Sequence, residues 1–220
     1  MSLWSIRKAA VVADRQQRQQ KQQQQAESTA SSPASTTSLR SPQSPQPPPS
    51  PSNGNTSSPS NPQVQASLIR IQKDITELGD LPPTMTLKFP DPADLTHFTV
   101  SIRPDEKYYK GGRFKFDVRM PATYPHDPPR VRHKKRVFHP NIDLEGNICL
   151  NILREEWKPV LNLEAVLVGL QYLLLEPNPE DPLNKEAAQM LRTSPASFKS
   201  TVRSTMNGGM YNGIIYDRVL

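Results

Sequence analysis

The amino-acid sequence changes character near residue 63, and this boundary limits which part of the chain can fold. Residues 1–63 are dominated by Gln, Ser and Pro. Such sequence cannot bury enough apolar surface to offset the entropy that a chain loses on folding. Residues 64–220 have a mixed composition and are long enough to bury a sizeable core. We therefore expect a disordered tail over residues 1–63 and one folded domain over residues 64–220.

The first ten residues differ from the rest of the tail. They read MSLWSIRKAA, so that Leu3, Trp4 and Ile6 form an isolated apolar patch at the far end of a polar spacer. Spacing alone favours a short docking peptide and a random hydrophobic start equally. The later segment SPQSPQPPPSPS is interpreted as a plain spacer, in preference to a phosphorylated segment or one that binds a proline-recognising domain.

Cysteine content, hydropathy and charge exclude several classes of protein. Cys149 is the only cysteine, so no disulfide scaffold can form within the chain. No run of about 18 apolar residues predicts a membrane span, and no secretory signal opens the chain. We therefore expect a cytoplasmic and nuclear protein without a membrane partner. The net charge is +6, and the tail, with six basic and two acidic residues, supplies most of it. The nearly balanced remainder argues against a nucleic-acid partner.

The folded part is expected to open with a helix. Asn61 followed by Pro62 is typical of a cap residue and a first turn, and Gly79 is expected to end the helix. Four apolar residues recur at helical spacing and predict its buried face: Leu68, Ile71, Ile75 and Leu78. Three charged residues among them are expected on its surface: Arg70, Lys73 and Asp74.

The segments that follow predict a sheet and then helices. Strand-like alternation, interrupted by turn-rich sequence, occurs in four segments: Thr84–Phe89, Thr96–Ile102, Phe114–Met120 and Arg130–Phe138. Helices are expected, the first of them central and buried, over Leu163–Leu175, Asn184–Leu191 and Pro195–Met206. The order predicts an α+β fold, in which a four-stranded antiparallel sheet accompanies an N-terminal helix, a central helix and two C-terminal helices. The basic residues of the fourth strand are interpreted as protection of a sheet edge rather than as a nucleic-acid patch.

An irregular stretch, His139–Trp157, lies between the sheet and the central helix and contains the lone thiol. The four His and one Cys lack the spacing of a metal site, so we expect no metal. No phosphate loop or dinucleotide fingerprint is present, so we expect no cofactor. A protease-like dyad would need His139 as its base. Pro140 follows in a tight turn, and we expect the imidazole of His139 to hydrogen-bond to the loop backbone instead.

A thiol among amides and carboxylates could carry an activated acyl group as a thioester. Attack on that thioester builds an oxyanion, and the amide of Asn141 could donate to it directly or brace the loop that does so. An attacking amine must be neutral, and the segment EPNPEDPLN could supply the carboxylate that orients it. Chemistry alone slightly favours the alternative that Cys149 is a small buried residue.

The motifs HPN, GNICL, Trp157 and YPHDPP together resemble the ubiquitin-conjugating enzyme family, over about residues 67–220. The resemblance implies the ubiquitin-conjugating-enzyme fold. It also implies that Cys149 receives a ubiquitin-like protein as a C-terminal glycyl thioester and passes it to a lysine, usually with a RING ligase engaged. Asn141 then supports the oxyanion or the active loop, and Asp181 orients the acceptor lysine and helps it to lose its proton. Supporting positions are His139, Pro140 and Asn151, the last standing where many relatives have Asp.

Longer segments, among them RIQKDITEL and GLQYLLLEPNPEDPLNKEAA, resemble the neddylation branch of that family. This resemblance implies that a modifier of the Nedd/Rub class comes from a heterodimeric activating enzyme, which itself uses the ATP, and goes mainly to cullins. It also implies docking of the activating enzyme on Leu3, Trp4 and Ile6, together with Arg70 and Lys73. A co-ligase contact at the N-terminus is less well supported, because Ser2 favours removal of Met1.

Two alternatives stay open at this point, and both concern what the cysteine carries. The chain could conjugate ubiquitin itself, or it could be a non-catalytic adaptor that binds a modifier without carrying it. Adaptors of that kind lack the cysteine, so Cys149 and the intact HPN motif favour the conjugating enzyme. We expect the protein to act as a monomer.

Overall fold

The computed structural model of the chain describes residues 62–220. The predicted tail over residues 1–63, apart from its last two residues, therefore lies outside the described residues, as do Leu3, Trp4 and Ile6 of the predicted docking peptide. Within residues 62–220, no helix is long and apolar enough to cross a membrane.

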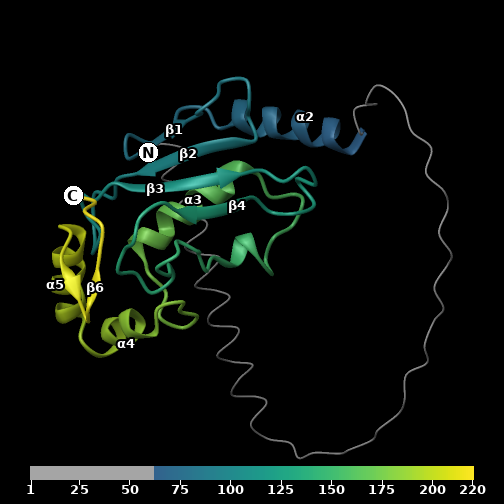
Figure 1. Cartoon of the computed structure of the whole chain (residues 1–220). Coiled ribbons are helices and arrows are strands. Elements are labelled where there is room, and N and C mark those ends of the chain that lie inside the picture. The colour runs from purple at the N-terminus through teal and green to yellow at the C-terminus, as the bar shows by residue number, and fades with distance from the viewer. Residues whose placement is uncertain (1–61) are drawn as a thin grey trace, which may run out of the picture.

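The sheet has four antiparallel strands in chain order, which confirms the predicted meander (Figure 1). The strands are β1 (Met85–Lys88), β2 (His97–Ile102), β3 (Phe114–Arg119) and β4 (Arg130–His133). Their buried residues alternate with more exposed ones, as expected for a sheet with one face on the core. The buried face of β2 and β3 is built from Phe98, Val100, Ile102, Phe114, Phe116 and Val118.

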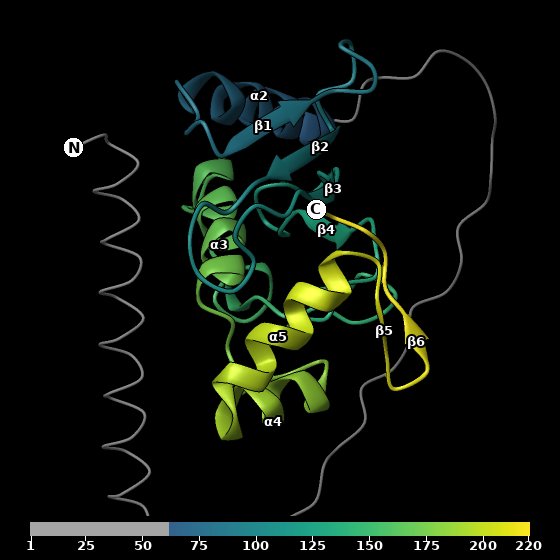
Figure 2. The ribbon, with the colours of Figure 1, turned by 90° about the vertical axis from the view of Figure 1, so that its left-hand side faces the viewer.

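In both views one helix lies at the top of the molecule with β1 and β2, a second runs through the middle, and the last two lie together at the bottom (Figures 1 and 2). They are α2 (Pro62–Glu77), α3 (Leu163–Leu175), α4 (Lys185–Thr193) and α5 (Pro195–Met206), with a short 3₁₀ turn η1 (Asn151–Leu153). The side chain of Asn162 caps α3 by accepting a hydrogen bond from the N–H of Ala165 at 3.0 Å. Most of α3 is buried, because its apolar residues surround the whole helix. The α+β prediction is thus confirmed, including the central position of this helix.

The fourth strand ends earlier than predicted, at His133 instead of Phe138. The N–H of Lys134 still donates to the carbonyl of Lys115 in β3 at 2.9 Å, and the chain then pairs with the C-terminal segment. The N–H of Arg136 donates to the carboxylate of Asp217 at 2.7 Å, and the N–H of Asp217 donates to the carbonyl of Arg136 at 3.1 Å. β4 is an edge strand, as expected, and its arginines Arg130 and Arg132 are exposed.

A small hairpin near the C-terminus was not predicted. It joins β5 (Met210–Tyr211) to β6 (Ile214–Ile215) through Asn212 and Gly213, which both have positive φ, at 46° and 75°. An Asn-Gly pair is the strongest short-range signal for a two-residue hairpin turn. The sequence therefore contained the information.

Two residues of the first helix also differ from prediction. Leu68 is 45% exposed, although it was expected on the buried face. Asp74 is only 3% exposed, so its expected surface position is wrong. The reason is that the carboxylate of Asp74 accepts hydrogen bonds from Arg70 of the same helix and from two other parts of the chain, as described below.

Candidate active site

The cysteine loop is held in shape by its own backbone. The N–H of Cys149 donates to the carbonyl of Asn141 at 2.9 Å, which joins the two ends of the HPN-to-Cys segment. Between them the chain turns at Gly146, whose φ is 84°. A Cβ there would lie 2.1 Å from the carbonyl oxygen of His133, so only glycine fits beside β4. The loop therefore has one fixed path around the thiol.

His139 is a structural residue of this loop. It is fully buried, and its Nδ1 accepts a hydrogen bond from the N–H of Asn141 at 2.9 Å. The proton therefore lies on Nε2, which donates to the carbonyl of Leu173 in α3 at 3.0 Å. Burial lowers the pKa of His139 to about 3. The imidazole hydrogen-bonds to backbone through both nitrogens, as predicted, and its Nδ1 is not free to accept the proton of Cys149.

The HPN segment also fixes the loop that carries Asp181. The carbonyl of Pro140 accepts hydrogen bonds from the N–H groups of Leu183 and Asn184, each at 2.9 Å. The side chain of Asn141 reaches the same loop, because its Nδ2 donates to the carbonyls of Asn178 at 2.7 Å and Asp181 at 3.3 Å. Its Oδ1 accepts from the N–H of Asn178 at 2.8 Å.

Asn141 is 2% exposed, and both ends of its amide are engaged in these contacts. The sequence left two roles open for this residue, a direct oxyanion donor or a brace for the loop. The hydrogen bonds made in this structure are those of a brace.

The thiol and the carboxylate, 32 residues apart in sequence, are brought together by this arrangement. Sγ of Cys149 donates to Oδ2 of Asp181 at 2.9 Å. Nη1 of Arg154 donates to the same sulfur at 3.4 Å. Burial and the hydrogen bond to Asp181 raise the pKa of the Cys149 thiol to about 11, while Arg154 acts in the opposite direction. The resting group is therefore a protonated thiol that contacts both an acceptor and a cation.

The exposure of the two partners differs in a way that suits group transfer. Cys149 is 6% exposed, whereas Asp181 lies at the surface. An amine arriving from solvent can therefore meet Asp181 before it reaches the sulfur. Asn151 is exposed and donates through its side chain to Glu156 at 3.3 Å. Among the described residues, no hydrogen bond joins Asn151 to the Cys149 thiol. The geometry therefore adds nothing to the supporting role expected for Asn151.

Sequence reasoning missed Arg154. It follows η1, five residues after Cys149, and a positive charge that close to a lone thiol was a signal that could have been weighed. Within residues 62–220, no cluster of three or more His, Cys, Asp or Glu side chains could hold a metal ion.

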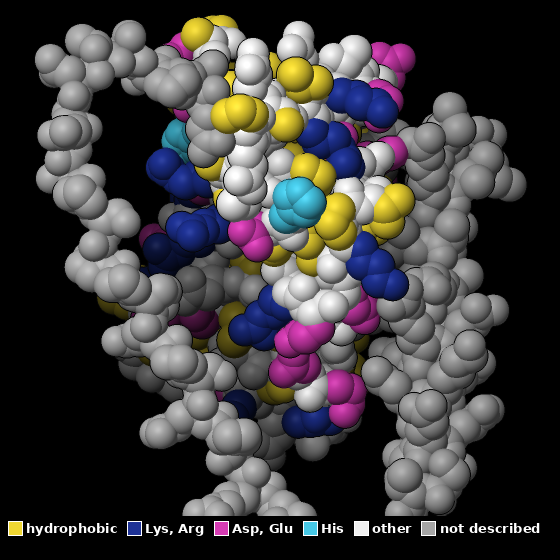
Figure 3. Space-filling model, turned by 90° about the vertical axis from the view of Figure 1, so that its right-hand side faces the viewer, with side chains coloured by type: hydrophobic (Ala, Val, Ile, Leu, Met, Phe, Trp, Pro, Cys, Tyr) yellow, Lys and Arg dark blue, Asp and Glu magenta, His cyan; other side chains and the backbone are white. Residues whose placement is uncertain are grey.

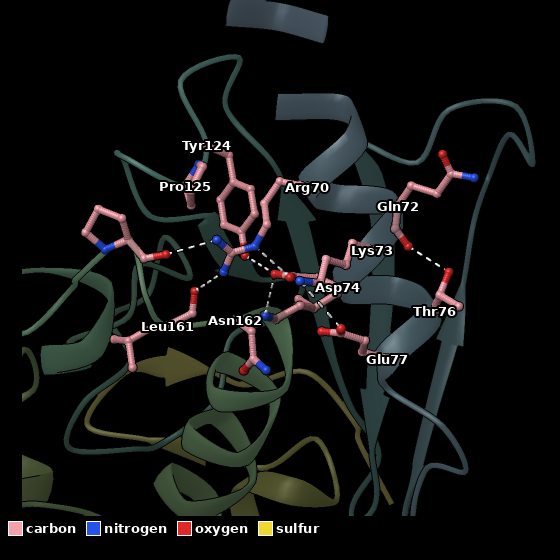
Figure 4. A network of polar contacts seen from close by, with 12 residues as sticks. Arg70, Gln72, Lys73, Asp74, Thr76, Glu77, Tyr124, Pro125, Leu161 and Asn162 are labelled. Atoms are coloured by element: carbon pink, nitrogen blue, oxygen red, sulfur yellow. Dashed lines mark hydrogen bonds and ion pairs between the residues drawn. The ribbon is translucent and has the colours of Figure 1, made fainter. Parts of the chain in front are cut away.

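The residues expected on the surface of the first helix divide into two groups (Figure 4). Arg70 points toward the segment before α3, where it donates to the carbonyls of Pro159 at 3.0 Å and Leu161 at 2.7 Å, and its Nε donates to Asp74 at 2.8 Å. Lys73 is exposed and lies 3.8 Å from Glu77. Of the two predicted docking residues on α2, only Lys73 has its charge available at the surface.

The carboxylate of Asp74 is the centre of the same network (Figure 4). Besides Arg70, it accepts hydrogen bonds from the hydroxyl of Tyr124 and, at 3.0 Å, from the N–H of Leu163. These donors come from the YPHDPP loop and from the first residue of α3. Asp74 therefore ties α2 to the YPHDPP loop and to the start of α3, which lie before and after the cysteine stretch in the sequence.

One face of the molecule shows how charge is distributed over the surface (Figure 3). Lys and Arg side chains on that face are interspersed with Asp, Glu and hydrophobic side chains, and they do not merge into one basic surface. This mixture agrees with the nearly balanced charge of the folded part.

Comparison with known proteins identifies the architecture built around Cys149. A family described as "Ubiquitin-conjugating enzyme" matches residues 70–206, which include the whole sheet, the cysteine loop and the Asp181 loop. The chain belongs to the ubiquitin-conjugating enzyme family. It is therefore a transferase that conjugates a ubiquitin-like protein, and the fold predicted from the resemblance is confirmed.

Individual relatives show which members of this family the chain is similar to. "NEDD8-conjugating enzyme ubc12" of Schizosaccharomyces pombe is 55% identical over 157 residues, which cover 71% of this chain and 88% of that relative. "NEDD8-conjugating enzyme Ubc12" of Arabidopsis thaliana is 49% identical over 70% of this chain and 84% of that relative. A solved structure, "S. cerevisiae Ubc12", superposes with a TM-score of 0.67 at 46% identity, covering 70% of this chain and 84% of that chain.

Proposed function

We propose that this enzyme accepts a NEDD8-class modifier from its activating enzyme as a glycyl thioester on Cys149 and transfers it to substrate lysines. The observation that carries the chemistry is the 2.9 Å contact between the Cys149 thiol and the Asp181 carboxylate. The choice of modifier is supported by the relatives, which are named as NEDD8-conjugating enzymes and are up to 55% identical.

Charging is a transthioesterification, in which the modifier moves from the cysteine of the activating enzyme to Cys149. Sγ of Cys149 attacks the carbonyl carbon of the modifier's terminal glycine, the new S–C bond forms, and the thiolate of the activating enzyme leaves. The proton on Sγ passes to Asp181, which already accepts a hydrogen bond from it, and the exposed carboxyl group then releases this proton to solvent before discharge. Because the incoming thioester is activated, the step needs little more than alignment and loss of this proton.

Discharge needs more help from the protein. The lysine amine attacks the thioester carbon, the C–N bond forms, and the C–S bond breaks. Asp181 orients the amine and takes the proton that it loses. The same carboxylate can return that proton to the Cys149 thiolate, which restores the hydrogen bond of the resting enzyme. Asn141 contributes by bracing the backbone around Asp181.

The partners follow from the same proposal. The activating enzyme of the neddylation pathway docks on the N-terminal peptide with Trp4 and Ile6 as anchors, and Lys73 of α2 adds an exposed positive charge. A RING ligase presents cullin lysines to the thioester. Arg70 is not assigned to docking, because its guanidinium donates to backbone carbonyls and to Asp74.

Parallel charging reactions test the choice of modifier. The full chain is mixed with ATP and either the neddylation activating enzyme and NEDD8 or the ubiquitin activating enzyme and ubiquitin, and initial rates are read on non-reducing gels. We expect a thiol-sensitive adduct to form much faster with NEDD8, and no such adduct with the Cys149→Ala variant. Faster charging with ubiquitin would instead support the alternative that ubiquitin itself is the modifier.

A further inference from the structure

Arg154 contacts the reacting sulfur in addition to Asp181. Its Nη1 donates to Sγ of Cys149 at 3.4 Å, whereas Oδ2 of Asp181 accepts from Sγ at 2.9 Å. The sulfur therefore has an acidic and a basic partner at the same time. Asp181 raises the pKa of the thiol and Arg154 lowers it.

The backbone holds Arg154 in that place. The 3₁₀ turn η1 brings the chain back toward the cysteine, since the N–H of Leu153 donates to the carbonyl of Leu150 and the N–H of Arg154 to that of Asn151, each at 2.9 Å. The carbonyl of Arg154 in turn accepts from the N–H of Trp157 at 3.1 Å. An arginine at this position thus has a fixed origin five residues after the nucleophile.

The charge of Arg154 is not used elsewhere in the described part of the chain. No ion pair joins it to a carboxylate of residues 62–220, unlike Arg70, Arg119 and Arg192. A guanidinium is always charged and presents several N–H donors, so it can follow a sulfur atom through small movements. Because Arg154 is exposed, its side chain has room for such movement.

We propose that Arg154 is a catalytic residue whose guanidinium stabilises the negative charge that develops on Sγ of Cys149. The inference rests on the proposed role of Cys149 as the thioester carrier. It deepens that role by assigning the group that helps sulfur to attack and to leave.

Charge develops on Sγ twice in the reaction. During charging, Sγ gives its proton to Asp181 and attacks as a thiolate, and the negative charge ends on the sulfur of the activating enzyme. During discharge, the amine attacks, the C–S bond breaks, and the bonding electrons remain on Sγ. Arg154 donates to Sγ at both moments and neither gains nor loses a proton. Donors aimed at developing charge are a major source of catalysis in enzymes.

Alkylation of the free enzyme tests the inference without any modifier. Cys149 is the only cysteine, so the rate of reaction with iodoacetamide reports this thiol alone. At pH values below the pKa of the thiol, we expect Arg154→Gln to slow alkylation about 3- to 10-fold. This factor is the effect of losing one charge-assisted hydrogen bond, reduced because Arg154 is exposed to solvent. Arg154→Lys should keep part of the rate. Arg103→Gln, an equal loss of charge at an exposed position after β2, should leave the rate unchanged.

Single-turnover discharge of the charged enzyme to free lysine is the second measurement. We expect Arg154→Gln to discharge more slowly by a similar factor, with Arg154→Lys between it and the wild type. Thermal melting of each variant confirms that it is folded. If Arg154→Gln matches the wild type in both alkylation and discharge, the inference is wrong while the proposed function stands. If the wild type itself forms no thioester, the proposed function fails first, and alkylation alone then decides whether Arg154 stabilises the thiolate.

Discussion

Replacing Asp181 by asparagine should change two reactions of Cys149 in opposite directions. In the resting enzyme the carboxylate accepts the S–H hydrogen bond at 2.9 Å, which stabilises the protonated thiol and raises its pKa. Asp181→Asn removes the negative charge and leaves a weaker acceptor. The pKa of the thiol should then fall toward its ordinary value, and the thiolate should become more abundant at any pH below that pKa.

The size of this change in the pKa of the thiol follows from the kind of hydrogen bond that Asp181 accepts. A hydrogen bond to a charged group contributes about 1.5–3 kcal/mol, but Asp181 is exposed, so solvent screening reduces the effect to about 1 kcal/mol. That free energy corresponds to a roughly fivefold larger thiolate fraction. Alkylation of Asp181→Asn by iodoacetamide should therefore be about five times faster than that of the wild type.

Transfer to lysine should respond in the other direction. Loss of a general base typically slows proton transfer by about 10²–10⁴-fold, and because water can partly replace an exposed carboxylate we expect the lower end of that range. Charging should change less than discharge, since the incoming thioester is already activated. Single-turnover charging and discharge to free lysine measure the two steps separately.

Glu180→Gln is the matched control, because Glu180 is an exposed acid next to Asp181 and pairs with Arg192 at 3.9 Å. It should leave alkylation and discharge close to wild type. If Asp181→Asn slowed alkylation, or if it impaired charging and discharge equally, the roles assigned to the carboxylate would be refuted.

Three further predictions concern the braces of the site and the tail. Asn141→Ala removes the contacts to the Asp181 loop and should cost about 1–3 kcal/mol in urea unfolding while slowing discharge; an unchanged discharge rate would rule out the bracing role. Asp74→Ala leaves the hydroxyl of buried Tyr124 unpaired and should lower the free energy of unfolding by about 3–5 kcal/mol, whereas a loss below about 1 kcal/mol would contradict this. Changing Trp4 and Ile6 together to Ala should slow charging by the activating enzyme about tenfold or more without altering thermal melting, and unchanged charging kinetics would exclude docking through these residues.

Elements bounded by strong local signals could be predicted from sequence alone. The predicted limits of α3 and α5 match the structure, because Asn162 caps the apolar run of α3 and Pro195 stands in the first turn of α5. The fourth strand was predicted too long because its alternating pattern continues past His133. The strand ends where Arg136 pairs with Asp217, 81 residues later in the chain. A local pattern of alternating residues cannot indicate so distant a partner.

Distant partners also explain why the positions of two charged residues, Asp74 and Arg70, were predicted wrongly. Helical periodicity placed Asp74 on the surface, since a carboxylate is rarely buried without partners. Its partners Tyr124 and Leu163 lie 50 and 89 residues away, so the local pattern could not show them. Arg70 was assigned to docking for the same reason, although its guanidinium is engaged by carbonyls before α3.

The candidate site shows a similar division. Chemical reasoning indicated that a lysine-activating carboxylate should come from the EPNPEDPLN segment, and the family resemblance pointed to Asp181. The structure places Asp181 against the thiol. The sequence did not show that the resting carboxylate accepts the thiol's own hydrogen bond, or that the side chain of Arg154 donates to the same sulfur. Both depend on side-chain geometry after the loops have been fixed by Pro140 and Asn141.

Intact mass spectrometry of the charged protein tests most directly the central claim that Cys149 carries the modifier. After reaction with the neddylation activating enzyme, NEDD8 and ATP, the account predicts a mass increase of one modifier that is lost on treatment with excess thiol. Cys149→Ala should show no increase, and Cys149→Ser should form an ester that resists the thiol. An adduct that persists on Cys149→Ala, or a wild-type adduct that survives thiol treatment, would contradict the account.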